Sequence, residues 1–469
     1  MPLSSAHAAS RTTTVRNAPS AGGGLGLRTL REFRRETLEF LCRVSNTHGD
    51  VVRWRLGPLP VYLLRSPEAV QHVLVDNNRN YDKKTRGYDA LRLFLGNGLL
   101  TSEGTFWRRQ RRIAQPAFHR QRIAGFGETM VALTERMRDD WARRADTGEP
   151  IDVAEEMTTL TLRIVAKTLM STDVDDENNE VGRSVELLNG FARDLMTNPF
   201  TLPMGLPTPK NLRFRRAADV LETKLRTIIS ERRRTGEDAP DLLSMLMSAR
   251  DEETGESMSD DQLRDEAMTI FLAGHETTAN ALAWAFYLLS THPDVERRLR
   301  AELAQVLGDR SPSMDDLAAL PYLQQVVKEC LRLYPPAWSI GRRAVAEDVI
   351  DGYRIEAGSL VILSPWVTHR HPTHWSNPEG FDPERFAPEL EKTRPRYAYF
   401  PFGGGPRLCI GNNFALMEAQ LVLATFVSRL SAALVPGHPV VPQPLITLRP
   451  AHGLRMTIHR PTVSAGSAS

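Results

Sequence analysis

The segment from residue 259 to residue 291 constrains the fold more than any other, because it predicts one unusually long helix. Ser259 and Gln262 have the spacing of a capping box, and no proline follows until Pro293. About 30 helical residues span ~45 Å at the usual rise per residue. The middle of the segment is apolar on nearly every side, so the helix is expected to cross a core rather than cover one.

Polar residues interrupt this apolar helix at its centre, from His275 to Thr278. Such a cluster costs stability unless something uses it. The Thr277 hydroxyl is predicted to bond back to the carbonyl of Ala273, which loosens the helix locally, and Glu276 is suited to relaying protons. The alternative is a pair of threonines that only satisfy themselves in a core. His275 is expected to be structural.

The most specific motif is Phe402 to Gly411, FGGGPRLCIG. Its glycines let the backbone lie close to a flat ligand, and Cys409 comes just before a predicted helix. A helix N-terminus lowers the pKa of a thiol and favours the thiolate, which binds metals. A lone cysteine is otherwise a small buried apolar residue. A dinucleotide-binding loop is a weaker alternative, because no βαβ unit accompanies the glycines.

The pattern Phe402, Gly405, Arg407, Cys409 and Gly411 resembles the haem-binding signature of the cytochromes P450. The resemblance extends over residues 49–458. It implies a mainly α fold with small β-sheets, in which the long central helix crosses the haem. It further implies haem b, Cys409 as the metal ligand, and insertion of one atom of O2 into a hydrophobic small molecule. Thiolate ligation favours O–O cleavage, the chemistry that this class requires.

Other motifs carry the same resemblance and imply roles for further residues. Thr277 and Glu276 are expected to deliver protons, with Ala273 beside the cofactor. The expected haem-propionate contacts are Trp107, Arg111, Arg407 and Arg342, with Arg343 as the substitute for Arg342. A structural network is expected from Glu329, Arg332 and Arg385, although an E-x-x-R pair alone is usually a solvated salt bridge. The expected substrate pocket comprises Leu100, Ala273, Ala337, Trp338 and Ile446.

External proteins are expected to supply the electrons, because the chain has no flavin, nicotinamide or iron–sulfur motif. The resemblance implies a ferredoxin and its reductase, fed indirectly by NAD(P)H. A basic face near Arg108 and Arg112 is expected to attract the acidic donor. A solvated helix surface is the alternative for these two arginines.

Composition excludes several other classes. Lys plus Arg (59) nearly equals Asp plus Glu (57), so a nucleic-acid binder is not expected. Three scattered cysteines indicate a reducing cytoplasm. No apolar run is long enough for a membrane anchor. We expect a monomer with a flexible tail at 1–27, one haem-binding domain at 28–460 and a C-terminal tail at 461–469.

Shorter patterns predict the remaining elements: a β-hairpin at 49–64, mostly helices from 67 to 303, a loop at 199–209, strands at 359–365 and 444–450, and a helix at 412–430. The histidines at 369, 371 and 374 are not expected to bind a metal, because Pro372 interrupts any helix there.

The substrate is expected to be a terpenoid, a fatty acid or a polyketide, since such pockets are lined by apolar groups. Two other functions stay open. One is a haem-thiolate enzyme that uses peroxide or catalyses oxidative coupling. The other is a haem-thiolate sensor or carrier without catalysis.

Overall fold

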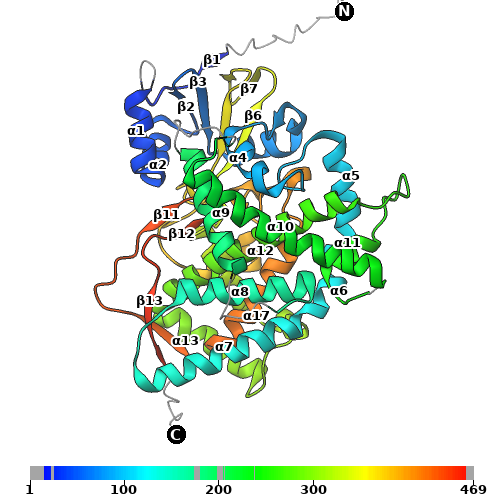
Figure 1. The fold of residues 1–469 in the computed structure, drawn as a ribbon. Coiled ribbons are helices and arrows are strands. Elements are labelled where there is room, and N and C mark those ends of the chain that lie inside the picture. Colours follow the sequence, from blue (N-terminus) through cyan, green and yellow to red (C-terminus); the bar gives the residue numbers. More distant parts are fainter. Residues whose placement is uncertain are drawn as a thin grey trace, which may run out of the picture.

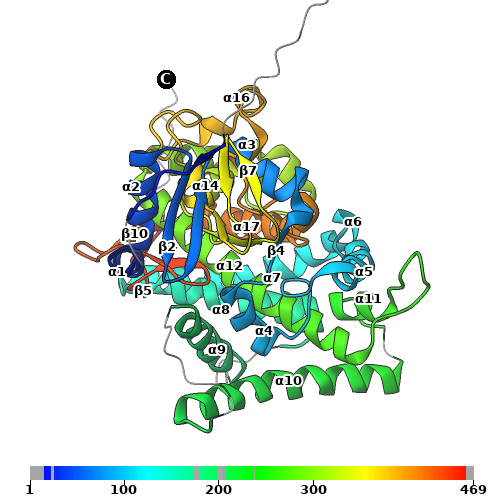
Figure 2. The same ribbon diagram turned by 90° about the horizontal axis from the view of Figure 1, so that it is seen from above.

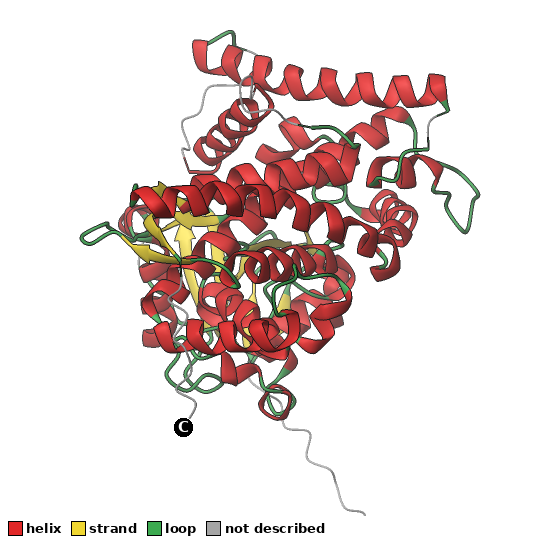
Figure 3. Cartoon of the chain, turned by 90° about the horizontal axis from the view of Figure 1, so that it is seen from below, coloured by secondary structure: helices red, strands yellow, loops and turns green. Residues whose placement is uncertain are grey.

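Helices make up most of the molecule, and the strands gather toward one side of it (Figures 1 and 3). The computed structural model describes residues 15–22, 26–173, 180–197, 204, 206–236 and 238–460. The helices are α1 Leu27–Arg35, α2 Thr37–His48, α3 Pro67–Gln71, α4 Arg86–Leu95, α5 Gly104–Ala114, α6 Arg120–Ile123, α7 Gly127–Thr147, α8 Val153–Met170, α9 Glu180–Thr197, α10 Pro209–Thr235, α11 Leu242–Ser248, α12 Asp260–Thr291, α13 Pro293–Leu307, α14 Pro321–Leu333, α15 Pro365–Thr368, α16 Pro388–Glu391 and α17 Asn412–Val427. The strands are β1 Arg16–Asn17, β2 Val51–Leu56, β3 Leu59–Leu64, β4 Tyr81–Asp82, β5 Ile151–Asp152, β6 Ile340–Ala344, β7 Asp348–Ile350, β8 Tyr353–Ile355, β9 Leu360–Leu363, β10 Ser431–Leu434, β11 Pro442–Pro444, β12 Leu448–Pro450 and β13 Arg455–His459.

The long central helix is α12, as the sequence predicts, and it has 32 residues. Ser259 caps it reciprocally with Gln262, since each residue accepts a hydrogen bond from the backbone N–H of the other. Its apolar residues belong to the largest hydrophobic cluster of the molecule. Figures 1 and 2 show α12 in the interior, with α9 and α10 forming an outer layer to one side. The helix therefore carries its polar residues into the middle of the protein.

A five-stranded sheet with the order β2-β3-β9-β6-β4 forms the second part of the fold. The predicted hairpin at 49–64 is confirmed as β2 and β3, which pair antiparallel across Gly57-Pro58. In β6 the side chains alternate between the two faces, so Arg342 and Arg343 point in opposite directions. This alternation decides which of the two arginines faces the interior.

A small hairpin, formed by β11 and β12, contacts the central helix α12. The Trp284 indole of α12 donates to the carbonyl of Leu448 (3.1 Å), and the Asn280 amide donates to the hydroxyl of Thr447 (3.0 Å). The Trp338 indole donates to the carbonyl of Leu445 (2.9 Å). Residues 445–448 are thus fixed by two side-chain hydrogen bonds from α12 and one from Trp338.

Part of the segment expected to be an N-terminal tail is instead packed on the fold. Arg16 and Asn17 form β1, which pairs with β8, and Ala18 is buried. Backbone hydrogen bonds also join residues 19–21 to Arg53. Short polar segments such as this lack the hydrophobic period that predicts a strand. Residues 1–14 and 461–469, and most of the expected loop at 199–209, lie outside the described residues.

Within the described residues, none of the helices is both long and apolar enough to cross a membrane. The 32-residue α12 illustrates why, because charged and polar residues are spread along it.

Candidate active site

The cysteine loop leads directly into α17. The backbone N–H of Cys409 donates to the carbonyl of Phe402 (3.0 Å), which closes the loop into a tight turn. Gly405 has a φ of +62°, and a Cβ there would lie 1.8 Å from the carbonyl oxygen of Leu74. Glycine is required at this position, because any side chain would separate the loop from the residues around Leu74.

Cys409 has accessible surface, yet the surrounding chain desolvates its sulfur. Burial raises the pKa of the thiol, while the backbone N–H of Gly411 and the guanidinium of Arg111 lower it. The predicted helix-terminus effect is present, but the net shift is upward because desolvation is the larger effect. A thiolate is therefore favoured here chiefly when a positive partner, such as a metal ion, accompanies it.

A cluster of buried cations lies beside the cysteine loop. The Arg407 guanidinium stacks on Trp107, 3.7 Å from the ring centroid, and its Nη1 has no hydrogen-bond partner. Arg342 is buried, and Lys83 donates from its Nζ to the carbonyl of Leu100 (2.9 Å). Burial lowers the pKa of Arg407 to about 10 and holds the pKa of Lys83 well below its usual range. Three basic side chains therefore share a desolvated site that disfavours their charged forms.

Within the described chain, Glu103 is the carboxylate that pairs with this cluster, through Arg407 at 3.1 Å. Among the described residues, one carboxylate therefore faces three basic groups, and added negative charge would favour their charged forms. The two propionates of haem would supply this charge, and the orphaned Nη1 of Arg407 would gain an acceptor. The residues present therefore fit haem: Cys409 would supply the thiolate ligand, and Arg407, Arg342 and Lys83 would hold the carboxylates.

Other expected propionate contacts have different partners. Arg343 pairs with Asp82 (2.6 Å), so Arg342 is the arginine of β6 that faces the cluster. Arg111 donates to the carbonyl of Leu408 (2.9 Å) and to Gln115 (2.7 Å). Arg111 thus supports the cysteine loop directly. Lys83 lies in no recognisable motif and was not predicted.

Replacing Lys83 with methionine is expected to separate cofactor binding from folding. Haem affinity should fall about tenfold or more, because one charge-assisted hydrogen bond to a carboxylate is lost. The haem-free protein should be as stable as wild type or more stable, because burial and two neighbouring arginines already disfavour a charged group at position 83. Haem transfer to apomyoglobin and thermal unfolding of the apoprotein measure the two effects. Loss of stability in the apoprotein would contradict this assignment.

The polar centre of α12 has the predicted internal hydrogen bonds. The Thr277 hydroxyl donates to the carbonyl of Ala273 (2.7 Å), and the Thr278 hydroxyl donates to the carbonyl of Gly274 (3.1 Å). His275 is buried and bonds to the carbonyl of Phe271, and burial lowers its pKa to about 4. His275 is therefore neutral at physiological pH, as a structural residue would be.

Glu276 is held by a residue that was not predicted. The Thr447 hydroxyl donates to its carboxylate (2.6 Å) and accepts from the Asn280 amide. Burial raises the pKa of Glu276, while Thr447 and Arg449 lower it. A carboxyl group with a raised pKa holds a proton more firmly than a free one, which suits a relay.

The structure brings Glu329, Arg332 and Arg385 together in the interior. Arg332 binds Glu329 in a bidentate pair (2.7 and 2.8 Å), and Arg385 lies 3.3 Å from the same carboxylate. Arg332 also donates to the carbonyl of His369, whose ring accepts the backbone N–H of Phe400 (2.9 Å). His369 thus connects the network to the segment that leads into the cysteine loop. This role of His369 was not predicted. Burial holds the pKa of its imidazole well below the usual range.

The expected pocket residues come from α12, which carries Ala273, and from three other segments of the chain. Leu100 and Ile446 are half-buried against the main core, and Ala273 is exposed on α12 itself. Trp338 packs on the cluster next to the sheet while its indole holds residue 445, beside Ile446. Ala337 is exposed. The geometry is compatible with an apolar wall, although no single contact defines the pocket.

Two carboxylates of α12 hold the loop that carries Leu100. Asp265 accepts the backbone N–H of Asn97 (2.6 Å), and Glu266 accepts that of Leu99 (2.8 Å). Burial raises the pKa of Glu266 to about 8, because desolvation outweighs the hydrogen bond from Leu99. This carboxyl group is predominantly protonated at neutral pH.

Stability is therefore expected to fall as the pH rises from about 5 to about 9. The folded state binds a proton at Glu266 that the unfolded state has already released, so ionisation on the alkaline side favours unfolding. Glu266→Gln should remove part of this loss, on the order of 1–2 kcal/mol near pH 9. Urea unfolding at pH 6 and pH 9 measures it. Asp261→Asn, on a 78% exposed side chain of the same helix, is the control and should leave the pH dependence unchanged.

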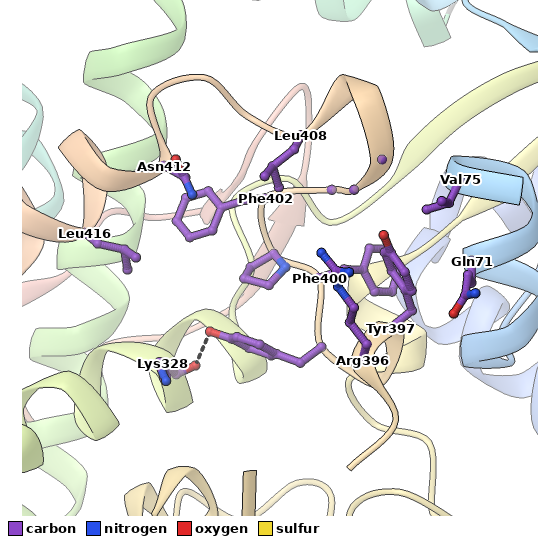
Figure 4. A pocket seen from close by; sticks show the side chains of 15 residues that line it. Gln71, Val75, Lys328, Arg396, Tyr397, Phe400, Phe402, Leu408, Asn412 and Leu416 are labelled. Atoms are coloured by element: carbon purple, nitrogen blue, oxygen red, sulfur yellow. Dashed lines mark hydrogen bonds between the residues drawn. The ribbon is translucent and has the colours of Figure 1, made fainter. Parts of the chain in front are cut away.

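A cavity of about 400 Å³ is lined in part by residues 400–405 and Leu408 of the segment that leads to Cys409 (Figure 4). Figure 4 shows Phe402, Asn412 and Leu416 on one side of it and Gln71, Val75 and Tyr397 on the other. Its lining includes neither Cys409 nor any residue of α12. It is therefore distinct from the site around Thr277, and we assign it no part in the chemistry.

The expected basic face on α5 is partly neutralised. Arg112 binds Asp251 in a bidentate pair (3.0 and 2.9 Å) and also binds Glu253 (2.7 Å). Arg108 is exposed, as expected. Arg112 is therefore paired within the chain, because an acidic loop distant in sequence folds onto it, and Arg108 is the arginine of the expected face that stays exposed.

Comparison with known proteins defines the class first. The sequence model described as "Cytochrome P450" matches residues 18–454. A solved structure described as the cytochrome P450DA heme domain superposes with a TM-score of 0.88, at 26% identity over 95% of this chain and 98% of that one.

Two Streptomyces melanosporofaciens proteins are similar over nearly their whole length. "Cyclooctatin synthase" is 42% identical over 90% of this chain and 91% of its own, and "Cyclooctat-9-en-7-ol 5-monooxygenase" is 38% identical over 93% of each chain. "Pentalenene oxygenase" of Streptomyces avermitilis is 37% identical over 91% and 94%. The chain belongs to the cytochrome P450 family and is a monooxygenase that uses haem, O2 and an external reductant.

Proposed function

We propose that this chain binds haem b through Cys409 and hydroxylates an apolar terpenoid with electrons from a ferredoxin and its reductase. NAD(P)H is the proposed ultimate reductant, and the proposed state is a cytoplasmic monomer. The observation that carries the proposal is that a cysteine loop lies beside a desolvated cluster of three basic side chains that has a single carboxylate partner. Bound haem supplies the activation of O2 and the insertion of oxygen into a C–H bond.

The chain's own residues position the substrate and move protons. Thr277 loosens α12 through its bond to Ala273, which makes room for a small molecule and a water. Glu276 holds a proton at its carboxyl group, and Thr447 fixes one of the carboxyl oxygens. Proton delivery at this position favours the use of O2 over peroxide, because peroxide already carries its protons.

The relatives favour the terpenoid among the three expected substrate classes. Two of them are named for cyclooctat-9-en-7-ol and pentalenene, which are unsaturated hydrocarbon skeletons, the first with one hydroxyl group. An apolar wall around Leu100 and Ile446 suits such a skeleton, because it offers few hydrogen-bonding groups to an incoming ligand.

Replacing Thr277 with alanine is expected to uncouple electron use from product formation. Haem binding should be retained, and product formed per electron pair should fall about tenfold or more as peroxide is released instead. Product and hydrogen peroxide, measured against NADPH consumed, check this. Thr278→Ala is the matched control on the next residue of α12, which bonds to Gly274, and it should stay coupled. Unchanged coupling in Thr277→Ala would remove the role assigned to Thr277.

The proposed function is tested with the purified, haem-loaded protein. The ferrous carbonyl complex should have the red-shifted band of thiolate ligation, and pentalenene should shift the ferric spin state. Turnover with a ferredoxin and reductase should then give a hydroxylated product. A thiolate-type carbonyl spectrum without turnover would favour a haem-thiolate sensor or carrier without catalysis. Turnover with peroxide alone would favour a peroxide-dependent enzyme.

A further inference from the structure

The surface of α5 lies next to the cysteine loop, because Arg111 donates to the carbonyl of Leu408. Electrons that enter near this surface therefore have a short path to the sulfur of Cys409. Arg108, Arg109 and Arg112 lie on the same helix. An unpaired row of arginines here would attract any acidic protein, whether or not that protein was the correct donor.

The chain covers part of this row with a hairpin of its own. The segment between α11 and α12 folds back at Gly255, and the backbone N–H of Asp251 donates to the carbonyl of Glu256 (2.8 Å). Figure 2 shows this green loop extending from α11 on the side of the molecule where α5 lies. The hairpin, residues 251–256, carries four carboxylates.

The contacts of the acidic hairpin divide into an anchor and two exposed pairs. The Asp251 side chain is fully buried and binds Arg112 through two hydrogen bonds, so it fixes the hairpin. Glu253 and Glu256 remain 69% and 59% exposed while they pair with Arg112 and Arg109 at 2.7 and 2.8 Å. Exposed pairs of this kind are weak and exchange readily.

We propose that the acidic hairpin competes with the electron donor for the arginines of α5. An acidic iron–sulfur protein binds by exchanging its own carboxylates for those of Glu253 and Glu256, while Asp251 keeps the hairpin in place. The competition lowers the affinity of every acidic protein for the arginines of α5. Only donors with enough well-placed carboxylates then bind there. This inference rests on the proposed use of a ferredoxin.

Neutral variants of the two exposed carboxylates test the competition directly. With a plant-type [2Fe–2S] ferredoxin as the probe, Glu253→Gln and Glu256→Gln should each tighten the Kd about two- to fivefold. The salt dependence of the Kd should also become steeper, because more free arginines face the donor. Titration of the haem-loaded protein by calorimetry at low and moderate salt measures both quantities.

Glu252→Gln is the matched control, because Glu252 lies in the same hairpin, is exposed, and acts on Arg112 only through space, without a direct ion pair to α5. The same gain in Glu252→Gln would show that only net charge matters, and would overturn the proposal. A double-mutant cycle gives the second test. Arg109→Gln should weaken ferredoxin binding more in the Glu256→Gln background than in wild type, and additivity would overturn the proposal.

The thiolate-type carbonyl spectrum separates this inference from the proposed function. If the spectrum is absent, the assignment of Cys409 fails. If the spectrum is present and the glutamine variants bind ferredoxin no better than wild type, the competition fails alone.

Discussion

Replacing Cys409 with serine is expected to abolish the red-shifted carbonyl band and to lower product formation below about 1% of wild type. A serine oxygen is a harder ligand than a thiolate, so it neither matches the metal nor donates the electron density that O–O cleavage requires. The fold should persist, because the loop is closed by a backbone hydrogen bond, from the N–H of residue 409 to the carbonyl of Phe402, that does not involve the side chain. Carbonyl difference spectra and product assays measure the change.

Cys42→Ser is the control for this variant, because Cys42 is half-buried next to the sheet rather than beside the cation cluster. It should keep both the spectrum and the activity. If the thiolate-type band survived in Cys409→Ser and disappeared in Cys42→Ser, the iron ligand would be Cys42, and our assignment of Cys409 would be wrong.

Glu329→Ala is expected to lower the free energy of unfolding by about 3–5 kcal/mol, the largest stability effect of any single substitution that we propose. Arg332 is fully buried, so loss of its bidentate partner leaves an uncompensated charge in the interior. Arg385 and the backbone N–H of Asp382 lose the same acceptor. Denaturant unfolding and the haem content of the purified protein measure the outcome.

Glu391→Ala is the control for Glu329→Ala. Glu391, at the end of α16, pairs with Lys328, which lies beside Glu329 on α14. The Glu391 side chain is 40% exposed. Removing it should cost less than about 1 kcal/mol, because solvent screens the pair. Equal losses in the two variants would mean that burial of the Glu329 network contributes nothing.

The predictions that succeeded depend on local patterns. The capping box and the unbroken apolar run of α12 are contiguous in sequence, and so are the glycines and the cysteine of the loop. Alternation along β6 also settles the choice between Arg342 and Arg343, once the strand is recognised. Such features follow from the period of the backbone, which a single sequence displays.

The residues that were missed act singly and over long distances in sequence. Thr447 reaches Glu276 across 171 positions, and Asp251 reaches Arg112 across 139. Lys83 and His369 similarly depend on where the sheet and α15 place them. Nothing in the local sequence distinguishes these residues from any other lysine, threonine or histidine, so only tertiary structure reveals them.

The short turn between β11 and β12 has a consequence for altering the enzyme's selectivity. Ile446, in the expected wall of the pocket, is adjacent to Thr447, which orients the carboxyl group of Glu276. The indoles of Trp284 and Trp338 fix the turn at both ends. A bulkier or smaller residue at position 446 is therefore expected to displace the Glu276 carboxyl group as well as the pocket wall. Regioselectivity and the release of peroxide should then change together in variants of this turn.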